Sequence, residues 1–215
     1  MRSIIYVDGF NLFYGVLKGG PYRWLDLDRY FELLRTDDDI QRIWYFTAII
    51  QGPRRHNQLT YLQALGSTPR VAIQVGRYKE KIVRCTATGC GYAGSREFQV
   101  PEEKGTDVNI AVQMLDDAYQ GHAERMVLVS GDSDLVPAIR TVKQRFPQIQ
   151  VTVYVPARDL RRGAATELRT AAHKHKTLPL GLLPRAQFEM VVRTPKGSVV
   201  KPAAWAPEPT TGHRP

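Results

Sequence analysis

The stretch "LVSGDSDLVP", residues 128–137, ends an apolar run with two acids and then begins a second apolar run. Only Ser133 separates Asp132 from Asp134, and two like charges beside a hydrophobic strand destabilise a fold unless something neutralises them. Strands of a parallel sheet commonly carry functional residues just beyond their carboxyl ends. These two acids are therefore the first candidates for a functional site.

Outward from this stretch, strand-like apolar runs alternate with helical patterns along most of the chain. The strand-like runs lie at 3–11, 42–50, 70–79, 81–85, 125–130 and 148–156. The helical patterns lie at 11–18, 25–35, 54–66, 106–120, 134–146 and 164–174. Strands that are apolar throughout and alternate with amphipathic helices are typical of a sheet covered on both faces. The sequence therefore predicts an α/β fold with a mostly parallel central sheet flanked by helices.

The pattern at 106–120 is the clearest helix of the chain. Thr106 or Asp107 is expected at its N-cap, where a side-chain oxygen accepts hydrogen bonds from the free backbone N–H groups. One apolar stripe is expected to face the core. It consists of Val108, Ala111, Val112, Leu115 and Ala118.

Four acids are expected to converge at one edge of the sheet. Asp8 ends the first expected strand, and Asp107 opens the helix just described. Each acid by itself is readily explained as a turn or capping residue. Together with Asp132 and Asp134 they repel one another, and Mg²⁺ or Mn²⁺ held by carboxylate oxygens relieves that repulsion. The sequence therefore predicts a metal site at this edge.

Three blocks of sequence carry a resemblance to a known family. They are "IIYVDGFNLFY" (4–14), "EEKGTDVNIAVQML" (102–115) and "VLVSGDSDLVPAI" (127–139). In this order and at these separations they resemble the NYN domain of the PIN-like nuclease superfamily, specifically its LabA/DUF88 branch. The resemblance extends to about residue 180 and is specific as a set, whereas each block alone is a weak signal. It implies a Rossmann-like PIN-type fold and a metal-dependent endoribonuclease.

The resemblance also implies roles for individual residues. The acids that match the family's metal site are Asp8, Asp107, Asp132 and Asp134. Asn11 matches a polar residue that orients Asp8 or a metal-bound water, and Ser130 matches a small hydroxyl residue before the last acidic pair. Such a site holds one or two ions that bind the scissile phosphate and activate a water for in-line attack. The expected products carry 5′-phosphate and 3′-hydroxyl ends.

Three other functions share fragments of these motifs. A domain of this fold that binds RNA or a protein without catalysis is the first, although an inactive relative would be expected to lack at least one acid. A haloacid-dehalogenase phosphatase is the second, but it needs an Asp where this chain has Phe10. An esterase with Ser133 as nucleophile is the third, and it lacks the late Asp-x-x-His pair that its chemistry requires.

The charge of the chain favours a polyanionic partner. Thirty Lys and Arg residues face 21 Asp and Glu residues, a formal net charge of +9, and such an excess favours nucleic acid first. The expected partner is RNA, single-stranded or structured. Candidate phosphate contacts, each also explained as an ordinary solvated charge, are Arg54, Arg55, Arg161 and Arg162. No apolar run approaches the roughly 20 residues that cross a bilayer, so no membrane partner is expected.

The two cysteines are expected to lie in a loop at about 84–96. Cys85 and Cys90 are the only thiols, and structural zinc needs four ligands. His56 or another subunit would have to supply the others, so a plain loop is favoured over a zinc site. Nothing suggests a disulfide scaffold, and Asp8 interrupts the first apolar run too early for a signal peptide. A cytoplasmic protein is expected.

The composition changes near residue 192. The remaining stretch, 193–215, is rich in proline and small residues and has no helical or strand period. Such composition is typical of a flexible tail. The expected organisation is therefore one nuclease-like domain at 1–192 and a tail, with Trp205 as the residue able to dock it.

Overall fold

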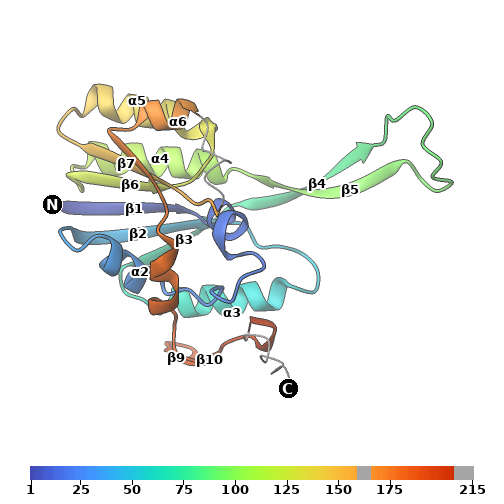
Figure 1. The fold of residues 1–215 in the computed structure, drawn as a ribbon, viewed down its shortest axis with the longest axis horizontal. Coiled ribbons are helices and arrows are strands. Elements are labelled where there is room, and N and C mark those ends of the chain that lie inside the picture. Colours follow the sequence, from blue (N-terminus) through green and yellow to red (C-terminus); the bar gives the residue numbers. More distant parts are fainter. Residues whose placement is uncertain (159–165, 206–215) are drawn as a thin grey trace, which may run out of the picture.

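The centre of the protein is a six-stranded sheet in which all neighbouring strands are parallel. The computed structural model describes residues 1–158 and 166–205, except the side chains of Pro101 and Glu102. The strand order is β3-β2-β1-β6-β7-β8 (Figure 1). The strands are β1 (Arg2–Asp8), β2 (Asp39–Thr47), β3 (Val71–Val75), β6 (Arg125–Val129), β7 (Gln150–Val155) and β8 (Lys174–Thr177). The predicted α/β fold with a mostly parallel central sheet is confirmed.

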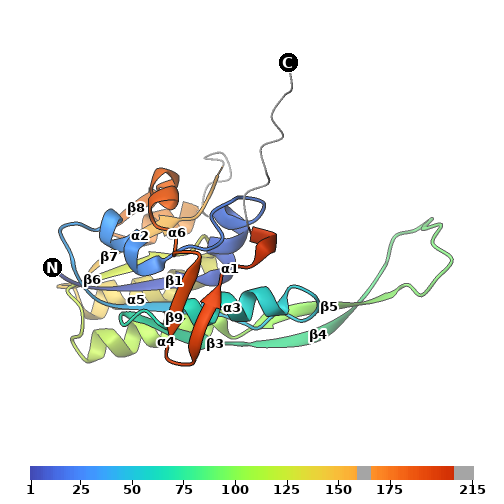
Figure 2. The ribbon, with the colours of Figure 1, turned by 90° about the horizontal axis from the view of Figure 1, so that it is seen from below.

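Helices cover both faces of this sheet (Figures 1 and 2). One face carries α4 (Thr106–Tyr119), α5 (Val136–Arg145) and α6 (Thr166–Ala171), and the other carries α2 (Leu27–Leu34) and α3 (Arg55–Leu65). Short helical turns complete the fold: α1 (Gly9–Leu12), the π-helical η1 (Phe13–Leu17), and the 3₁₀ turns η2 (Ser133–Leu135), η3 (Leu180–Arg185) and η4 (Ala203–Trp205). Within the described ranges, no helix combines the length and apolarity needed to span a lipid bilayer.

The alternation of side chains along β1 divides the core into two halves. Ile5 and Val7 lie in the apolar cluster beneath α2 and α3, whereas Ile4 and Tyr6 lie in the cluster beneath α4, α5 and α6. Successive side chains of a strand point to opposite faces, so an apolar strand with helices on both sides serves both clusters. This is the reason that the central strands are apolar throughout.

The buried side of α4 differs from the predicted one. Val108 and Val112 are 64% and 60% exposed, while Ile110 and Met114 are fully buried. Apolar residues lie on two sides of α4. The side that packs on the sheet is the one that also carries Asp117. The Asp117 carboxylate is buried and accepts hydrogen bonds from the Tyr6 hydroxyl (2.9 Å) and the Trp44 indole N–H (3.2 Å). The predicted stripe was therefore correct only in part: Ala118 is buried and Leu115 packs against the core, whereas Val108 and Val112 lie outside it.

A two-stranded antiparallel ribbon projects from the domain (Figure 1). It consists of β4 (Arg77–Arg84) and β5 (Glu97–Lys104). The strand-like run expected at 70–79 is divided at Gly76, where β3 ends and the ribbon begins. A Cβ at Gly76 would lie 3.0 Å from the Thr106 hydroxyl oxygen and 3.2 Å from the Lys104 carbonyl oxygen, so glycine permits the close approach of the two ribbon ends. The predicted loop with both cysteines joins the two strands at the far tip.

Part of the range predicted as a tail is structured. A hairpin of β9 (Val191–Thr194) and β10 (Gly197–Val200) lies against α3, and Val192 and Val199 pack on the core. Trp205 packs edge to face on Trp24, with ring centroids 6.1 Å apart. These apolar side chains are too few to give a period in the sequence, but each has a core neighbour. The rest of the predicted tail, 206–215, lies outside the described residues.

Candidate metal centre

The carboxylate of Asp8 is buried and held from three directions at the end of β1. Its Oδ1 accepts a hydrogen bond from the Asn11 backbone N–H (2.9 Å). Its Oδ2 accepts hydrogen bonds from the Asn11 side-chain amide (2.5 Å) and the Ser130 hydroxyl (3.0 Å). Burial raises the pKa of Asp8, and these hydrogen bonds oppose that rise. The side chain is thus fixed in one orientation, and only 2% of the residue is exposed.

The turn after β6 is joined to the end of β1 by the same polar residues. β1 and β6 are neighbours, with Val7 paired to Val129. Beyond this pair, the Gly131 backbone N–H donates to Asn11 Oδ1 (3.1 Å). The Ser130 hydroxyl, which donates to Asp8, also accepts from the Asp132 backbone N–H (3.1 Å). Asn11 and Ser130 therefore bind two strand ends together and place Asp132 beside Asp8.

Three other carboxylates meet next to this link. One ligand oxygen from each of Asp107, Asp132 and Asp134 lies within 4.8 Å of the others. Asp107 comes from the first turn of α4, and Asp132 caps η2 by accepting from the Asp134 backbone N–H (3.0 Å). Asp107 and Asp132 are half-buried and Asp134 is exposed, so the group opens toward solvent. We call these three residues the acidic triad.

Burial and neighbouring negative charges act on the Asp107 carboxylate of the acidic triad. Burial, followed by the charges of Asp132, Asp8 and Asp134, raises the pKa of Asp107 to about 6. Three carboxylate oxygens at this spacing suit a hard divalent cation, which prefers oxygen ligands and keeps several waters. Asp8 is not part of the triad, because both of its oxygens accept hydrogen bonds from Asn11 or Ser130. Its charge nevertheless acts on Asp107.

Two residues near the triad were missed by the sequence analysis. The Glu103 carboxylate, at the end of β5, accepts a hydrogen bond from the Thr106 hydroxyl. Burial, then Asp8 and Asp107, raises the pKa of Glu103 to about 7. Tyr45 comes from β2, and burial, then Asp8 and Glu103, raises the pKa of its hydroxyl. The available signal for Glu103 was its position in "EEKGTD", four residues before Asp107.

Gly9 explains how Tyr45 comes so close to Asp8. A Cβ at Gly9 would lie 2.7 Å from both the Cζ and the hydroxyl oxygen of Tyr45, and 2.7 Å from the Phe46 carbonyl oxygen. Any side chain here would displace the ring or the strand. The glycine in "VDGFN" therefore allows β2 and the turn after β1 to touch.

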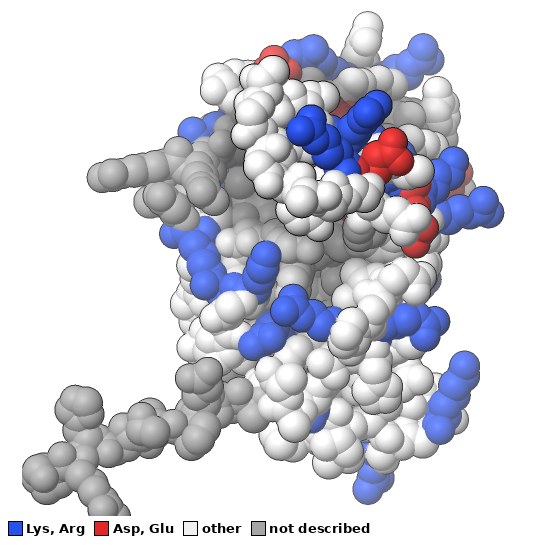
Figure 3. All heavy atoms as spheres, turned by 90° about the vertical axis from the view of Figure 1, so that its right-hand side faces the viewer, with Lys and Arg blue, Asp and Glu red and all other residues white. Residues whose placement is uncertain are grey.

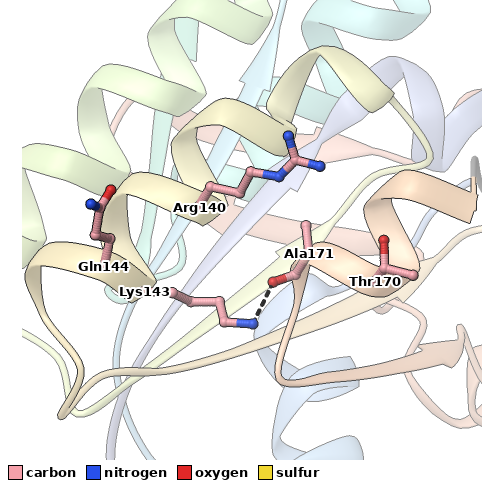
Figure 4. A pocket seen from close by; sticks show the side chains of 5 residues that line it. All are labelled: Arg140, Lys143, Gln144, Thr170 and Ala171. Carbon is pink, nitrogen blue, oxygen red and sulfur yellow. Dashed lines mark hydrogen bonds between the residues drawn. The ribbon is translucent and has the colours of Figure 1, made fainter.

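Two hollows lie on the surface. One, of about 530 Å³, is lined by residues that follow Asp8 directly, Gly9 and Phe10, and by Thr47 at the end of β2. The other, of about 340 Å³, lies between α5 and α6 and is lined by Arg140, Lys143, Gln144, Thr170 and Ala171 (Figure 4). In this second hollow the Lys143 ammonium donates to the Ala171 carbonyl oxygen (2.7 Å). It contains no residue of the triad and is separate from the metal centre.

The predicted phosphate contacts fall into two groups. Arg54 and Arg55 are exposed at the start of α3. Arg161 and Arg162 lie outside the described residues. On the end of the molecule from which the ribbon projects, Lys and Arg side chains are spread widely, and Asp and Glu are confined to the upper half of the view (Figure 3).

The predicted cysteine loop supplies no complete zinc site. Cys85 and Cys90 are free thiols. In the part of the chain that the structure describes, the triad is the only group of three or more His, Cys, Asp or Glu residues with ligand atoms close enough to share an ion. The alternative of an esterase with Ser133 as nucleophile also lacks support. His173 lies away from Ser133, and its Nδ1 accepts a hydrogen bond from the Val151 backbone N–H.

Comparisons with known proteins show what this chain is similar to. A family model described as the NYN domain matches residues 2–179. A curated relative from Pseudomonas putida (strain DSM 28022 / S16), named 6-hydroxy-3-succinoylpyridine 3-monooxygenase HspA, is 33% identical over 241 residues, covering 97% of this chain and 77% of the relative. A solved structure of a protein of unknown function, VPA0982 from Vibrio parahaemolyticus RIMD 2210633, superposes with a TM-score of 0.53 at 19% identity, covering 83% of this chain and 93% of that one. The last similarity concerns the fold alone.

Proposed function

Since this chain belongs to the NYN domain family, we propose that it is a metal-dependent endoribonuclease that hydrolyses RNA phosphodiester bonds at a Mg²⁺ or Mn²⁺ site. The observation that carries this proposal is the acidic triad. Asp107, Asp132 and Asp134 come from two separate segments, yet their oxygens lie within 4.8 Å of one another. Such a concentration of charge destabilises the metal-free protein, and a cation that also binds phosphate compensates for it.

The residues of the metal centre have different roles in the proposed mechanism. A bound divalent ion would polarise a phosphoryl oxygen and lower the pKa of a water. The triad would hold that ion, and Asp8, fixed by Asn11 and Ser130, adds a charge in a set orientation. Glu103, with a pKa raised to about 7, is able to take up or release a proton near neutral pH beside the triad. Binding of the ion and transfer of the proton both proceed without a His or Cys nucleophile.

The substrate side of the proposal rests on charge. The chain carries a formal net charge of +9, and exposed basic side chains occupy the end that bears the ribbon (Figure 3). RNA would be held largely through its phosphates, with Arg54 and Arg55 among the contacts. Hydrolysis at the triad is expected to leave 5′-phosphate and 3′-hydroxyl ends. RNA is proposed over DNA from the family alone.

A cleavage assay on single-stranded and structured RNA tests the proposal. We expect cleavage with Mn²⁺ or Mg²⁺, none with excess EDTA, and strong loss in Asp107→Asn. Asp116→Asn is the matched control, because Asp116 lies on the same helix, is exposed, and bonds only Gln120 among the described side chains. Cleavage that continues in EDTA, or that Asp116→Asn reduces as much as Asp107→Asn, contradicts the metal mechanism. RNA binding without cleavage would instead identify a non-catalytic NYN domain.

A second candidate function follows from the relative. A protein named as a monooxygenase of a small aromatic acid is 33% identical over 97% of this chain, and a hollow with aromatic lining adjoins the acidic centre. Oxygenation of a small aromatic acid is therefore the alternative. It is tested by oxygen uptake with 6-hydroxy-3-succinoylpyridine and a nicotinamide reductant. Uptake that depends on this substrate, in a protein that leaves RNA intact, would replace the nuclease proposal.

A further inference from the structure

The hollow beside the acidic centre has a composition that differs from the rest of the surface. It encloses about 530 Å³ between η1, the end of β2, the start of α3 and η4. Its volume falls within the roughly 300–1,000 Å³ that pockets for small ligands occupy. We call it the aromatic pocket. Gly9 and Phe10, the two residues that follow Asp8 in the chain, form part of its wall.

Flat side chains make up much of the wall. They are Phe10, Phe13, Tyr14, Tyr45, Tyr61 and Trp205. The rings of Phe10 and Tyr14 are nearly parallel, at 19°, with centroids 6.2 Å apart. Trp205 meets Tyr61 edge to face at 5.9 Å, so the C-terminal segment closes one side. Walls of this kind favour an aromatic guest, because rings gain from stacked and edge-to-face contacts beyond the area they bury.

The charged residues of the pocket all have the same sign. Lys18, Arg23 and Arg54 line it, and no Asp or Glu does so among the described residues. None of the three forms an ion pair with a carboxylate in residues 1–158 and 166–205. The Lys18 ammonium lies over the Tyr14 ring at 4.8 Å, and Arg23 Nε donates to the Gly20 carbonyl oxygen (3.1 Å). Three cations without counter-charges around an apolar hollow attract an anion.

We propose that the aromatic pocket binds a flat aromatic ring that carries a negatively charged group. The ring lies among the aromatic side chains, and the anionic group meets the cationic rim of Lys18, Arg23 and Arg54. Two sources offer this chemistry: a nucleotide unit of RNA and a small aromatic carboxylic acid. Either would lie next to Asp8. The inference goes beyond the proposed nuclease activity and does not depend on it.

Binding is measured by isothermal titration calorimetry on the full chain in EDTA, so that the metal centre contributes nothing. The ligands are uridine 5′-monophosphate beside uridine, and nicotinate beside nicotinamide, each an anion beside its neutral counterpart. We expect at least one anion to bind about tenfold or more tightly than its counterpart, since a hydrogen bond to a charged group is worth that much. Binding of uridine 5′-monophosphate alone assigns the pocket to a nucleotide, and binding of nicotinate alone assigns it to a small aromatic acid.

A matched pair of variants localises the site. Arg54→Gln removes a cation that lines the pocket, whereas Arg169→Gln removes an exposed cation of α6 that does not. Both are surface changes, so equal melting temperatures are expected. The first should weaken binding of the anion by about tenfold and the second should leave it unchanged. The proposal is overturned if no ligand binds, if neutral and anionic ligands bind equally, or if both variants have the same effect.

Discussion

The acidic centre has two halves that differ in how negative charge is stabilised: a closed half around Asp8 and an open half formed by the acidic triad. On the closed half, the Asp8 carboxylate is 2% exposed and accepts hydrogen bonds from Asn11 and Ser130. On the open half, ligand oxygens of the three triad carboxylates lie within 4.8 Å of one another, and one hydrogen bond joins these residues, from the Asp134 backbone N–H to Asp132. Hydrogen bonds make the closed half part of the fold. The open half is the part at which we propose that a metal ion binds.

Of the effects that distinguish the two halves, the largest is expected in the rate of RNA cleavage. Asp132→Asn removes one charge from the triad but keeps Oδ1, so the cap on Asp134 survives. Cleavage of RNA should fall by on the order of 100-fold or more, because the ion or its water loses an anionic ligand. The measurement is the single-turnover rate over a range of Mn²⁺ concentrations, starting from the one that saturates wild type. Should the rate recover fully at higher Mn²⁺, Asp132 contributes affinity for the ion and nothing further.

The next effect is on stability and belongs to the closed half. Ser130→Ala removes the donor to Asp8 Oδ2 and the acceptor for the Asp132 backbone N–H. The loss of these two hydrogen bonds, one of them to a buried carboxylate, should lower the free energy of unfolding by about 1–3 kcal/mol. Chemical denaturation in EDTA measures it, with Ser133→Ala as the control in the same turn. If the two variants unfold alike, the bridge between β1 and β6 is not structural.

The acids of both halves were predicted from the sequence, whereas two neighbouring residues that interact with them were not. The positions of Asp8 and Asp132 follow from apolar strands that end in acids, a purely local pattern. Glu103 and Tyr45 were missed because their raised pKa values arise from segments brought together only by the fold. The buried side of α4 was predicted only in part, because the hydrogen bond from Tyr6 that helps to place Asp117 in the core spans 111 residues. Long-range polar contacts leave no period in the sequence.

The third effect is a pH dependence of the open half. The pKa of Asp107 is raised from 3.8 to about 6 and that of Glu103 from 4.5 to about 7. A raised folded-state pKa means that the folded protein binds more protons than the unfolded chain between the two values. The stability from these groups is therefore complete below the unfolded pKa and is lost as the pH rises through the folded pKa. The melting temperature in EDTA should fall between about pH 5 and pH 7.5 through these groups.

Mn²⁺ should reverse this trend, because it competes with protons for the same oxygens. The rise in melting temperature on adding Mn²⁺ is expected to be larger at about pH 7.5 than at about pH 5. Asp116→Asn, on the solvent side of α4, should behave as wild type. An equal response to Mn²⁺ at both pH values would show that the ion binds away from the titrating acids.

The smallest effect is expected from removing a charge of the open half in the absence of metal. Asp107 lies in the first turn of α4, where the helix dipole favours an acid by about 0.3–1 kcal/mol. Burial, and after it repulsion from Asp132, Asp8 and Asp134, acts against the charged form and raises the pKa of Asp107. Asn keeps the shape and removes the charge, so Asp107→Asn in EDTA should be as stable as wild type or more stable by a few tenths of a kcal/mol. Added Mn²⁺ should then stabilise wild type by mass action and the variant much less. Thermal melts with and without Mn²⁺ measure both effects. If the variant melts well below wild type and Mn²⁺ raises both melting temperatures equally, Asp107 is a helix-stabilising residue and not a ligand.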